Sequence, residues 1–381
     1  MSLNKIIYLD NNSTTRVDDS VIQEMLPYFT EGYANASSSH LFGLTVNDAV
    51  DTARRQVADL IGAKPKEITF TSGATESINQ IIKGLSNQTK KHIVTVTTEH
   101  KAVLNSCAFM ETQGFHVTYI PVNKDGTIDL NALQNAIRND TLLVSIMFVN
   151  NETGLIHPIK QISDLAHAKG ALFMTDATQA IGKIVINVNE LAIDLLSLSA
   201  HKFYGPKGIG ALYVSAIAKI KLNSQIHGGG QQRKLRSGTL NVPGIVGLGK
   251  ACEIAQEKMS EDTIRITRLR DRLETALLKI DNAYINGNTT QRLYNTSNIC
   301  FPGINSDKLI IALQNIAVSS GSACTAVTTE PSYILKAMGL DDADALASIR
   351  FSLGRFTTDE DITATIGKVE EMVIKLRNEH Q

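Results

Sequence analysis

The feature that most constrains the fold is an alternation of short β-rich runs with helical patterns between about residues 45 and 215. Six such runs each end at polar or glycine residues: EITFT, HIVTVTT, FHVTYIPV, LLVSIMFVN, ALFMTDA and DLLSLSA. The alternation predicts a mostly parallel sheet covered by helices on both faces. Ligands of open sheets of this kind bind at the carboxyl ends of the strands. That rule nominates residues 71–77, His100, 150–152, 176–179 and 199–202 for one site.

The pattern changes after GTLNVPG, where a long amphipathic helix begins. Its apolar face carries Ile245, Leu248, Ala251, Ile254, Ala255, Leu269, Leu273 and Leu277. We expect this helix to lead into a second domain, in which short strands such as SNICF and SIRFSL alternate with helices such as SDKLIIALQNI. The sequence therefore predicts a large domain at 15–255 and a smaller α+β C-terminal domain at 256–381, with residues 1–14 packed against the smaller one.

Composition narrows the class of partner. The 381 residues are 43% hydrophobic, which is enough for a sizeable core, and 37 Lys and Arg face 38 Asp and Glu. This balance argues against direct binding to nucleic acid or to an anionic membrane. The apolar run before Asp10 is too short for a signal peptide or a membrane span, and the four cysteines have no disulfide-framework or zinc-site spacing. We expect a cytoplasmic protein without a resident metal, because no His, Cys or carboxylate cluster has ligand spacing.

Three stretches carry chemistry. In SLSAHKFYGPKGIGAL, Lys202 follows a buried-type strand and faces a cleft, where its amine could form a Schiff base with a carbonyl cofactor. In ALFMTDATQAIG, Asp176 ends an apolar strand, where a carboxylate could keep a pyridine nitrogen protonated. In EITFTSGATES, a strand runs into Gly73 and a helix start, so the amides that follow form a phosphate cradle.

Each stretch alone has a plainer interpretation. Lys202 could be a solvated surface lysine, Asp176 a helix N-cap, and TSGATES a capping box that uses Thr75 or a neighbouring hydroxyl. The combination of cradle, carboxylate and lysine, in that order along an α/β chain, is much more specific than any part.

With TTEHKAVL, VNNETG, TDATQA, RSGTLNVP, SSGSACTA and IRFSLGRFTT added, the sequence resembles the cysteine desulfurases, pyridoxal-phosphate enzymes of the class V aminotransferase group. The resemblance extends from YLDNNSTT to the last helix, and SSGSACTA followed by EPSYILKAMG is similar to the branch with the longer catalytic-cysteine loop. It implies a fold type I pyridoxal-phosphate enzyme that converts L-cysteine to L-alanine and passes the sulfur to an acceptor protein.

The resemblance also implies roles for individual residues. Lys202 holds pyridoxal 5'-phosphate and moves the substrate's α-proton, while His100 stacks on the ring and assists proton transfer; a lone histidine is more often structural. Asp176 pairs with the ring nitrogen, and Gln179 bonds the ring hydroxyl, which the i, i+3 spacing makes reasonable. The implied phosphate ligands are Ala74, Thr75, Ser199 and His201.

The resemblance further implies that Thr239 completes the phosphate site of a neighbouring subunit, which would make the enzyme a homodimer. A turn threonine is the plainer interpretation. The resemblance also implies that Asn151 and Arg350 bind the substrate α-carboxylate, for which the forked guanidinium is suited, and that Asn151 belongs to the cofactor-binding residues as well. Arg355 is the rival, and Arg350 is favoured because it lies on the strand-like IRFS run.

Cys324 lies in SSGSACTA, among Ser320, Gly321, Ser322 and Ala323. A free cysteine is usually a small buried hydrophobe, but a small and polar segment predicts a mobile loop, 319–330, that carries a reactive thiol. The resemblance implies that Cys324 takes up the sulfur as a persulfide, and mobility would let it serve both cofactor and acceptor. The other cysteines lie in helical or strand patterns and look structural: Cys107, Cys252 and Cys300.

The sequence departs from the family in places. Asn11, Asn12 and Ser13 stand where alanines are common, and we expect them to touch no catalytic role. The chain stops at Gln381, where housekeeping bacterial members continue into a tail that docks the iron-sulfur scaffold. The acceptor therefore stays open among iron-sulfur assembly, transfer-RNA thiolation and DNA phosphorothioation.

Two other functions stay open. A selenocysteine lyase or another class V aminotransferase would keep Lys202 and Asp176 without needing Cys324. A sulfur carrier or assembly scaffold that has lost the cofactor would be colourless.

Overall fold

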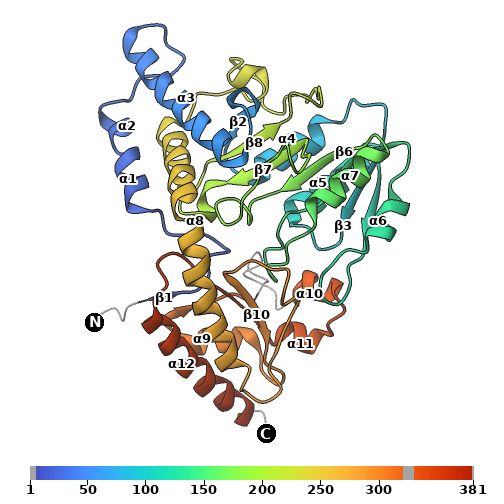
Figure 1. The fold of residues 1–381 in the computed structure, drawn as a ribbon, viewed down its shortest axis with the longest axis vertical. Coiled ribbons are helices and arrows are strands. Elements are labelled where there is room, and N and C mark those ends of the chain that lie inside the picture. The colour runs from blue at the N-terminus through green and yellow to red at the C-terminus, as the bar shows by residue number, and fades with distance from the viewer. Residues whose placement is uncertain (1–5, 321–329, 380–381) are drawn as a thin grey trace.

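The computed structural model describes residues 6–320 and 330–379. Figure 1 shows an upper and a lower lobe, and the long helix α8 (Val242–Leu277) runs through both. The first strand, β1 (Ile7–Tyr8), and the final helix, α12 (Asp359–Asn378), both lie in the lower lobe.

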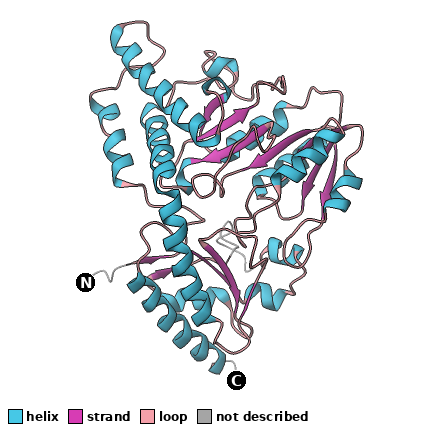
Figure 2. Cartoon of the chain, viewed as in Figure 1, coloured by secondary structure: helices cyan, strands magenta, loops and turns pink. Residues whose placement is uncertain are grey.

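The upper lobe is built on a seven-stranded sheet, drawn as magenta arrows in Figure 2. In spatial order the strands are β2 (Ile68–Thr71), β8 (Gly210–Val214), β7 (Leu195–Ser199), β6 (Leu172–Asp176), β5 (Thr141–Ser145), β3 (His92–Val96) and β4 (His116–Ile120). Strand β8 runs antiparallel to both neighbours, and the other six share one direction. The predicted mostly parallel sheet is confirmed, and its six expected runs are β2 to β7. Strand β8 is an addition, because the glycines of PKGIGAL are typical of a turn.

Helices cover both faces of this sheet. Successive strand residues point to opposite faces, so Ile93 packs with one hydrophobic cluster and Val94 with the other. One face is covered by α4 (Ala74–Gly84) and α5 (Lys101–Thr112). The opposite face is covered by α3 (Leu41–Ile61), α6 (Leu130–Ala136), α7 (Ile159–Ala168) and the first half of α8. Helices α1 (Asp19–Met25) and α2 (Pro27–Thr30) precede α3 along the edge of the lobe.

The lower lobe has its own hydrophobic core. Its three-stranded antiparallel sheet has the order β12 (Ser348–Ser352), β10 (Thr296–Cys300) and β9 (Tyr284–Ile285). Strand β1 pairs in parallel with β11 (Ile316–Ala317), which brings Ile7 and Leu9 into the same core. The remaining elements of this lobe are α9 (Ser306–Leu313), α10 (Tyr333–Ala337) and α11 (Asp342–Leu346).

Helix α8 belongs to both cores. Its residues up to Ala255 pack into the upper cluster, and those from Ile266 onward pack into the lower one. The expected domain boundary at residues 255 and 256 stays a prediction, and the change of core along α8 supports it.

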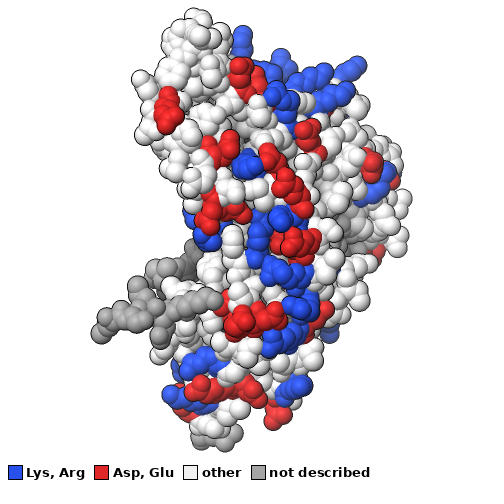
Figure 3. Space-filling view, turned by 60° about the vertical axis from the view of Figure 1, so that its left-hand side comes forward, with Lys and Arg blue, Asp and Glu red and all other residues white. Residues whose placement is uncertain are grey.

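Within the described parts of the chain, no helix has both the length and the apolarity needed to cross a bilayer. Figure 3 shows cationic and anionic side chains interspersed on the face turned forward, in line with the formal net charge of −1.

Candidate active site

A cavity of about 570 Å³ opens at the carboxyl edge of the large sheet, where six strands end. It is lined by residues from the upper lobe, from the N-terminal segment and from β12 of the lower lobe. Most of the nominated side chains meet here: Ala74, Thr75, His100, Asn151, Asp176, Gln179, Ser199, His201, Lys202 and Arg350. The structure therefore brings together residues that are up to 276 positions apart in the sequence, counted from 74 to 350.

Lys202 is presented by the end of β7. The strand stops at Ser199 and a short 3-10 turn, Ala200–Lys202, follows it. This turn is tight, since a Cβ on Gly205 would come within 2.8 Å of the Cβ of Ala200. The Lys202 ammonium donates to the carbonyl oxygens of Asn12 and Ser13, each at 2.7 Å. Its amine is thus held at the wall of the cavity, partly buried rather than in bulk water.

The start of helix α4 forms a second wall. Gly73 at the N-cap has φ of 153°, a conformation that side chains rarely adopt, and no side chain caps the helix. The capping-box interpretation of TSGATES is therefore wrong: Glu76 reaches back only to the amide of Ser72, at 2.8 Å. A helix start without a side-chain acceptor directs its amides and its positive dipole end toward an anion. Ala74 and Thr75 present these amides to the cavity.

Asp176, the last residue of β6, lines the cavity. Its Oδ1 atom accepts hydrogen bonds from the backbone amide of Thr178 at 3.0 Å, from the Thr178 hydroxyl at 2.5 Å and from Ser197 Oγ at 3.1 Å. The hydrogen bond from the Thr178 backbone amide is the local contact that the N-cap interpretation of Asp176 predicts. These contacts fix the carboxylate in place at the cavity, where an anion can face a protonated ring nitrogen.

The two histidines of the cavity are held by different elements. His100 is the N-cap of α5, and its Nδ1 accepts from the amide of Ala102 at 3.1 Å. Burial, with Lys202 and Lys101 nearby, lowers the pKa of His100, although Asp176 opposes the shift. A neutral ring whose Nδ1 accepts must carry its proton on Nε2. Burial and the neighbouring lysines lower the pKa of His201 to about 4, so that ring is neutral as well.

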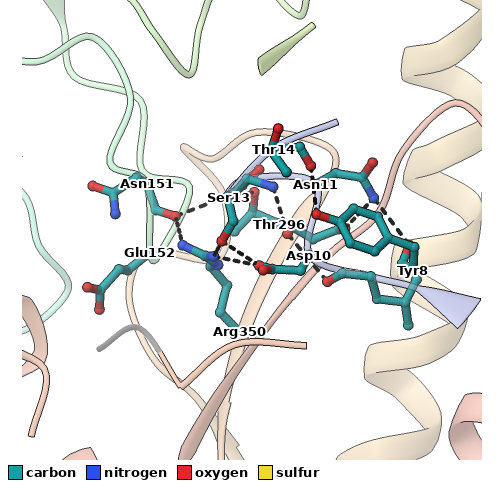
Figure 4. A network of polar contacts seen from close by, with 12 residues as sticks. Tyr8, Asp10, Asn11, Ser13, Thr14, Asn151, Glu152, Thr296 and Arg350 are labelled. Carbon is teal, nitrogen blue, oxygen red and sulfur yellow. Dashed lines mark hydrogen bonds and ion pairs between the residues drawn. The ribbon is translucent and has the colours of Figure 1, made fainter. Parts of the chain in front are cut away.

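Arg350 lies on β12 of the lower lobe and lines the cavity. Figure 4 shows its guanidinium between Asp10, Ser13 and Asn151. Its Nη2 donates to Asp10 Oδ1 and to Ser13 Oγ, both at 2.7 Å, and its Nη1 donates to the carbonyl of Asn151 at 3.0 Å. The Arg350 Nε and the Asn151 Oδ1 are buried and find no hydrogen-bond partner among the described residues. Buried polar atoms of this kind usually have a partner, which supports a ligand beside them.

The rival arginine is used elsewhere. Arg355 pairs with Asp262 at 2.8 Å and with Asp18 at 3.2 Å, and its guanidinium lies 4.3 Å from the centre of the Tyr204 ring. Arg355 does not line the cavity. Its contacts indicate a structural role between α8 and the segment after β12.

The N-terminal segment corrects one expectation. The expectation that Asn12 and Ser13 lie apart from the chemistry is wrong, since both line the cavity and accept hydrogen bonds from Lys202. Asn12 also donates from its amide nitrogen to Ser352 Oγ at 2.9 Å and from its side chain to Thr296 at 2.9 Å. The segment is thus tied to the lower lobe, and local sequence patterns contain no signal of such long-range contacts.

Two buried acids are sequence neighbours of residues that line the cavity. Glu99 was not predicted, whereas Glu152 is the last residue of the nominated range 150–152. Glu99 is fully buried, and burial together with Asp176 holds the pKa of its carboxyl well above the usual range. Burial raises the pKa of Glu152 to about 7, despite a 2.5 Å hydrogen bond from Ser332 Oγ. The position of Glu99 directly before His100 is the signal that could have found it.

Thr239 is the one described candidate residue that the structure does not bring to the cavity. It is exposed within one chain. Cys324, with most of the predicted loop 319–330, lies outside the described residues. The other three cysteines are buried, and burial raises the pKa of each thiol, to about 12 for Cys107 and about 11 for Cys300.

Comparison with known proteins identifies the class. The model of the family "Aminotransferase class-V" matches residues 7–365. The cysteine desulfurase IscS of Pasteurella multocida (strain Pm70) is 53% identical over 377 residues, which are 97% of this chain and 93% of the relative. A NifS-like protein of known structure has a TM-score of 0.92 at 40% identity, covering 97% of this chain and 100% of that one. The solved structure of SspA in complex with cysteine has a TM-score of 0.81 at 39% identity, covering 92% and 99%.

The chain therefore belongs to the class V aminotransferase family. Within that family it is a cysteine desulfurase, and such enzymes depend on pyridoxal phosphate.

The residues of the cavity fit that cofactor. The uncapped start of α4 suits a phosphate, the Lys202 amine suits an aldehyde, and the anchored Asp176 carboxylate suits a pyridinium nitrogen. The phosphate, the aldehyde and the ring nitrogen of the cofactor thus each have a chemically suitable partner in the same cavity.

Proposed function

We propose that this enzyme converts L-cysteine to L-alanine by the residues of this cavity and transfers the sulfur through Cys324 to an acceptor protein. The observation that carries the proposal is the meeting of Lys202, Asp176, His100 and Arg350 in one cavity, beside an uncapped helix start. The relatives named cysteine desulfurase, and the similar structure of SspA with cysteine bound, agree with this substrate.

Each wall of the cavity would hold one part of the cofactor. Lys202 would carry it covalently, Asp176 and Gln179 would hold the ring, and His100 would lie against the ring face. The proposed phosphate ligands are Ala74, Thr75, Ser199 and His201. The chemistry that pyridoxal phosphate supplies when bound is an electron sink for bonds broken at the substrate's α-carbon.

The substrate's carboxylate would accept from Arg350, whose buried Nε–H has no hydrogen-bond partner among the described residues, and from the side-chain NH₂ of Asn151. The Asn151 Oδ1 atom only accepts, so it would face a donor such as the substrate's amine. Arg350 is already neutralised by Asp10, so an incoming carboxylate meets a guanidinium that is fixed in position by three hydrogen bonds. This fixed geometry supports binding of an amino acid rather than an uncharged thiol.

Side chains of the protein would carry out the proton transfers and the sulfur transfer. Lys202 would remove the proton from the substrate's α-carbon, and the Nε2–H of neutral His100 would serve as a donor in the same cavity. The thiolate of Cys324 would attack the substrate sulfur, forming an S–S bond as the substrate's C–S bond breaks. The electron pair of the broken bond stays with carbon, which takes up a proton on the way to alanine.

A homodimer is part of the proposal. Thr239 is exposed in one chain and is free to reach the cavity of a second copy. Large apolar side chains are exposed on and beside α2 and α3: Leu26 (51%), Phe29 (60%), Tyr33 (71%), Leu41 (81%) and Leu44 (50%). Five large exposed apolar side chains within one stretch of 19 residues, 26–44, support an interface there. Light scattering should give about twice the 41.4 kDa mass of one chain.

The pathway that uses the sulfur depends on which protein accepts it from the enzyme. Similarity to relatives named IscS over nearly the whole chain favours iron-sulfur assembly over transfer-RNA thiolation and DNA phosphorothioation. We propose a cytoplasmic location, because the reaction needs a reduced thiol on the enzyme. Co-purification of a sulfur-accepting protein from a cytoplasmic extract is the direct check of both statements.

Two variants test the core of the proposal. The wild-type protein should be yellow, and Lys202→Ala should lose the cofactor absorbance. Cys324→Ser should keep the colour but lose persulfide formation and alanine production from cysteine. Full turnover by Cys324→Ser would favour a selenocysteine lyase or another aminotransferase, and a colourless wild-type protein would favour a sulfur carrier.

A further inference from the structure

A second lysine lies behind the cavity and takes no part in the chemistry described so far. Lys183 follows Gly182 in TDATQAIGK, and its residue is only 5% exposed. Gly182 has φ of 70°, and a Cβ there would come within 2.9 Å of Phe203 Cβ, so the turn is closely packed. Buried ammonium groups are rare because they lose their hydration, and each calls for a specific role.

Lys183 is connected to the cavity by a short chain of hydrogen bonds. Its Nζ donates to Gln179 Oε1 at 2.9 Å, and Gln179 Nε2 donates to the carbonyl of Asn12 at 2.8 Å. The same carbonyl accepts from Lys202 at 2.7 Å. Lys183 thus contacts the side-chain amide of Gln179, and Gln179 itself lines the cavity together with Asp176.

The chemistry of these partners fixes the orientation of the Gln179 amide. An amine or ammonium on Lys183 donates, and a backbone carbonyl only accepts. Gln179 must therefore turn Oε1 toward Lys183 and its NH₂ toward the Asn12 carbonyl, which leaves the second N–H of that NH₂ group for the cavity. An ammonium on Oε1 also polarises the amide, which makes the opposite N–H a stronger donor.

The surroundings of Lys183 are electrostatically unusual. Burial is the main cause that lowers the pKa of its amine, to about 7, and the positive charges of Lys202 and Arg350 on the cavity side add to the shift. On its other side Lys183 lines a groove together with Asp59 and Arg292. Below pH 7 the ammonium is held at a cost in desolvation that the bond to Gln179 partly offsets, and above pH 7 the neutral amine still donates to Gln179 Oε1.

We propose that Lys183 is a positioning residue of this enzyme: through Gln179 it aims and strengthens an N–H donor at the ring oxygen of the bound cofactor. The inference rests on the proposed cofactor role of Gln179. A stronger donor on that oxygen stabilises its negative charge, and so favours the deprotonated form of the cofactor bound to Lys202. Loss of Lys183 should raise the pH at which the absorbance of the bound cofactor changes.

The test is an absorbance titration of the holoenzyme between pH 6 and 10. Lys183→Met removes the donor and the charge while keeping an unbranched apolar stem, and Lys183→Gln keeps an N–H donor without the charge. Lys169→Met is the matched control, because it removes the same charge from an exposed position at the end of α7. We expect the midpoint of Lys183→Met to rise by about 0.5 to 1 pH unit, Lys183→Gln to lie between it and the wild type, and Lys169→Met to match the wild type.

A double variant separates positioning from a direct effect of charge. In a Gln179→Ala background the further change Lys183→Met should leave the midpoint unchanged, because the intermediary is already absent. A midpoint in Lys183→Met equal to that of the wild type, or an equal shift with and without Gln179, would overturn the inference. Should Lys183→Met fail to fold, the same comparison is made with Lys183→Gln.

Failure of the inference can be told apart from failure of the proposed function. Borohydride reduction followed by peptide mass spectrometry shows whether Lys202 carries the cofactor in each protein. Absence of the cofactor mass on Lys202 of the wild type refutes the proposed function. Its presence together with unshifted midpoints refutes only the role of Lys183.

Discussion

The buried amine of Lys183 predicts a pH dependence of stability that can be measured without the cofactor. The folded chain releases the Lys183 proton near pH 7, whereas the unfolded chain keeps it up to about the ordinary value of 10.5. Between these values the unfolded state binds more protons, so the free energy of unfolding rises with pH. Each pH unit of this window is worth about 1.4 kcal/mol, and the interval from pH 7 to pH 9 therefore contributes up to about 2.7 kcal/mol.

The assay compares urea unfolding of the cofactor-free wild type with Lys183→Met at pH 7 and pH 9. Protein concentration is kept constant because dimer dissociation would otherwise change the midpoint. The wild type should gain about 2 to 3 kcal/mol more than the variant over this interval, while Lys169→Met should behave as the wild type. Parallel curves for wild type and Lys183→Met would refute the argument, since they would mean that Lys183 has the same proton affinity in both states.

Three further predictions concern other walls of the site. Gly73→Ala forces a side chain into φ of 153°, which costs about 1–3 kcal/mol; cofactor affinity measured by fluorescence should fall at least about tenfold, and unchanged affinity would argue against the α4 phosphate site. Arg350→Gln should raise KM for cysteine more than it lowers kcat, because it removes a carboxylate ligand, and a normal KM would remove Arg350 from substrate binding. Glu152 has a folded pKa of about 7 against an ordinary 4.5, so its folded form binds more protons and stability falls as pH rises through this window; Glu152→Gln should remove that slope in urea unfolding, and a retained slope would contradict it.

Hydrophobic periodicity was sufficient for the main sheet and for the long helix. Runs such as LLVSIMFVN and ALFMTDA are buried on both faces, so their composition alone distinguishes them from turns and helices. Strand β8 lacks that signature because Gly210 must be small: a Cβ there would come within 2.4 Å of the Leu198 carbonyl oxygen and 2.7 Å of the Gly73 Cα. The glycine that this close approach of two backbones requires is indistinguishable, in the sequence, from a glycine of a turn.

Predictions from local sequence patterns were least accurate for groups that line the cavity. TSGATES contains the hydroxyl and carboxyl side chains typical of a capping box, yet the N-cap is Gly73 and the helix start is left without a side-chain cap. The Asn12–Ser13 segment shows the opposite error, since it was expected to take no part in the chemistry but its backbone carbonyls accept from Lys202. In both cases the partner lies elsewhere in space, and sequence spacing contains no information about it.

The sequence by itself determined the class of fold and the chemical identity of the site, because strand composition, strand-end residues and long motifs are local properties of the chain. Tertiary structure alone decided which arginine reaches the cavity, how the N-terminal segment holds Lys202, and why Gln179 can point only one way. Those outcomes depend on hydrogen-bond partners between residues as distant as Asp10 and Arg350, and such partners exist only after both lobes have folded together.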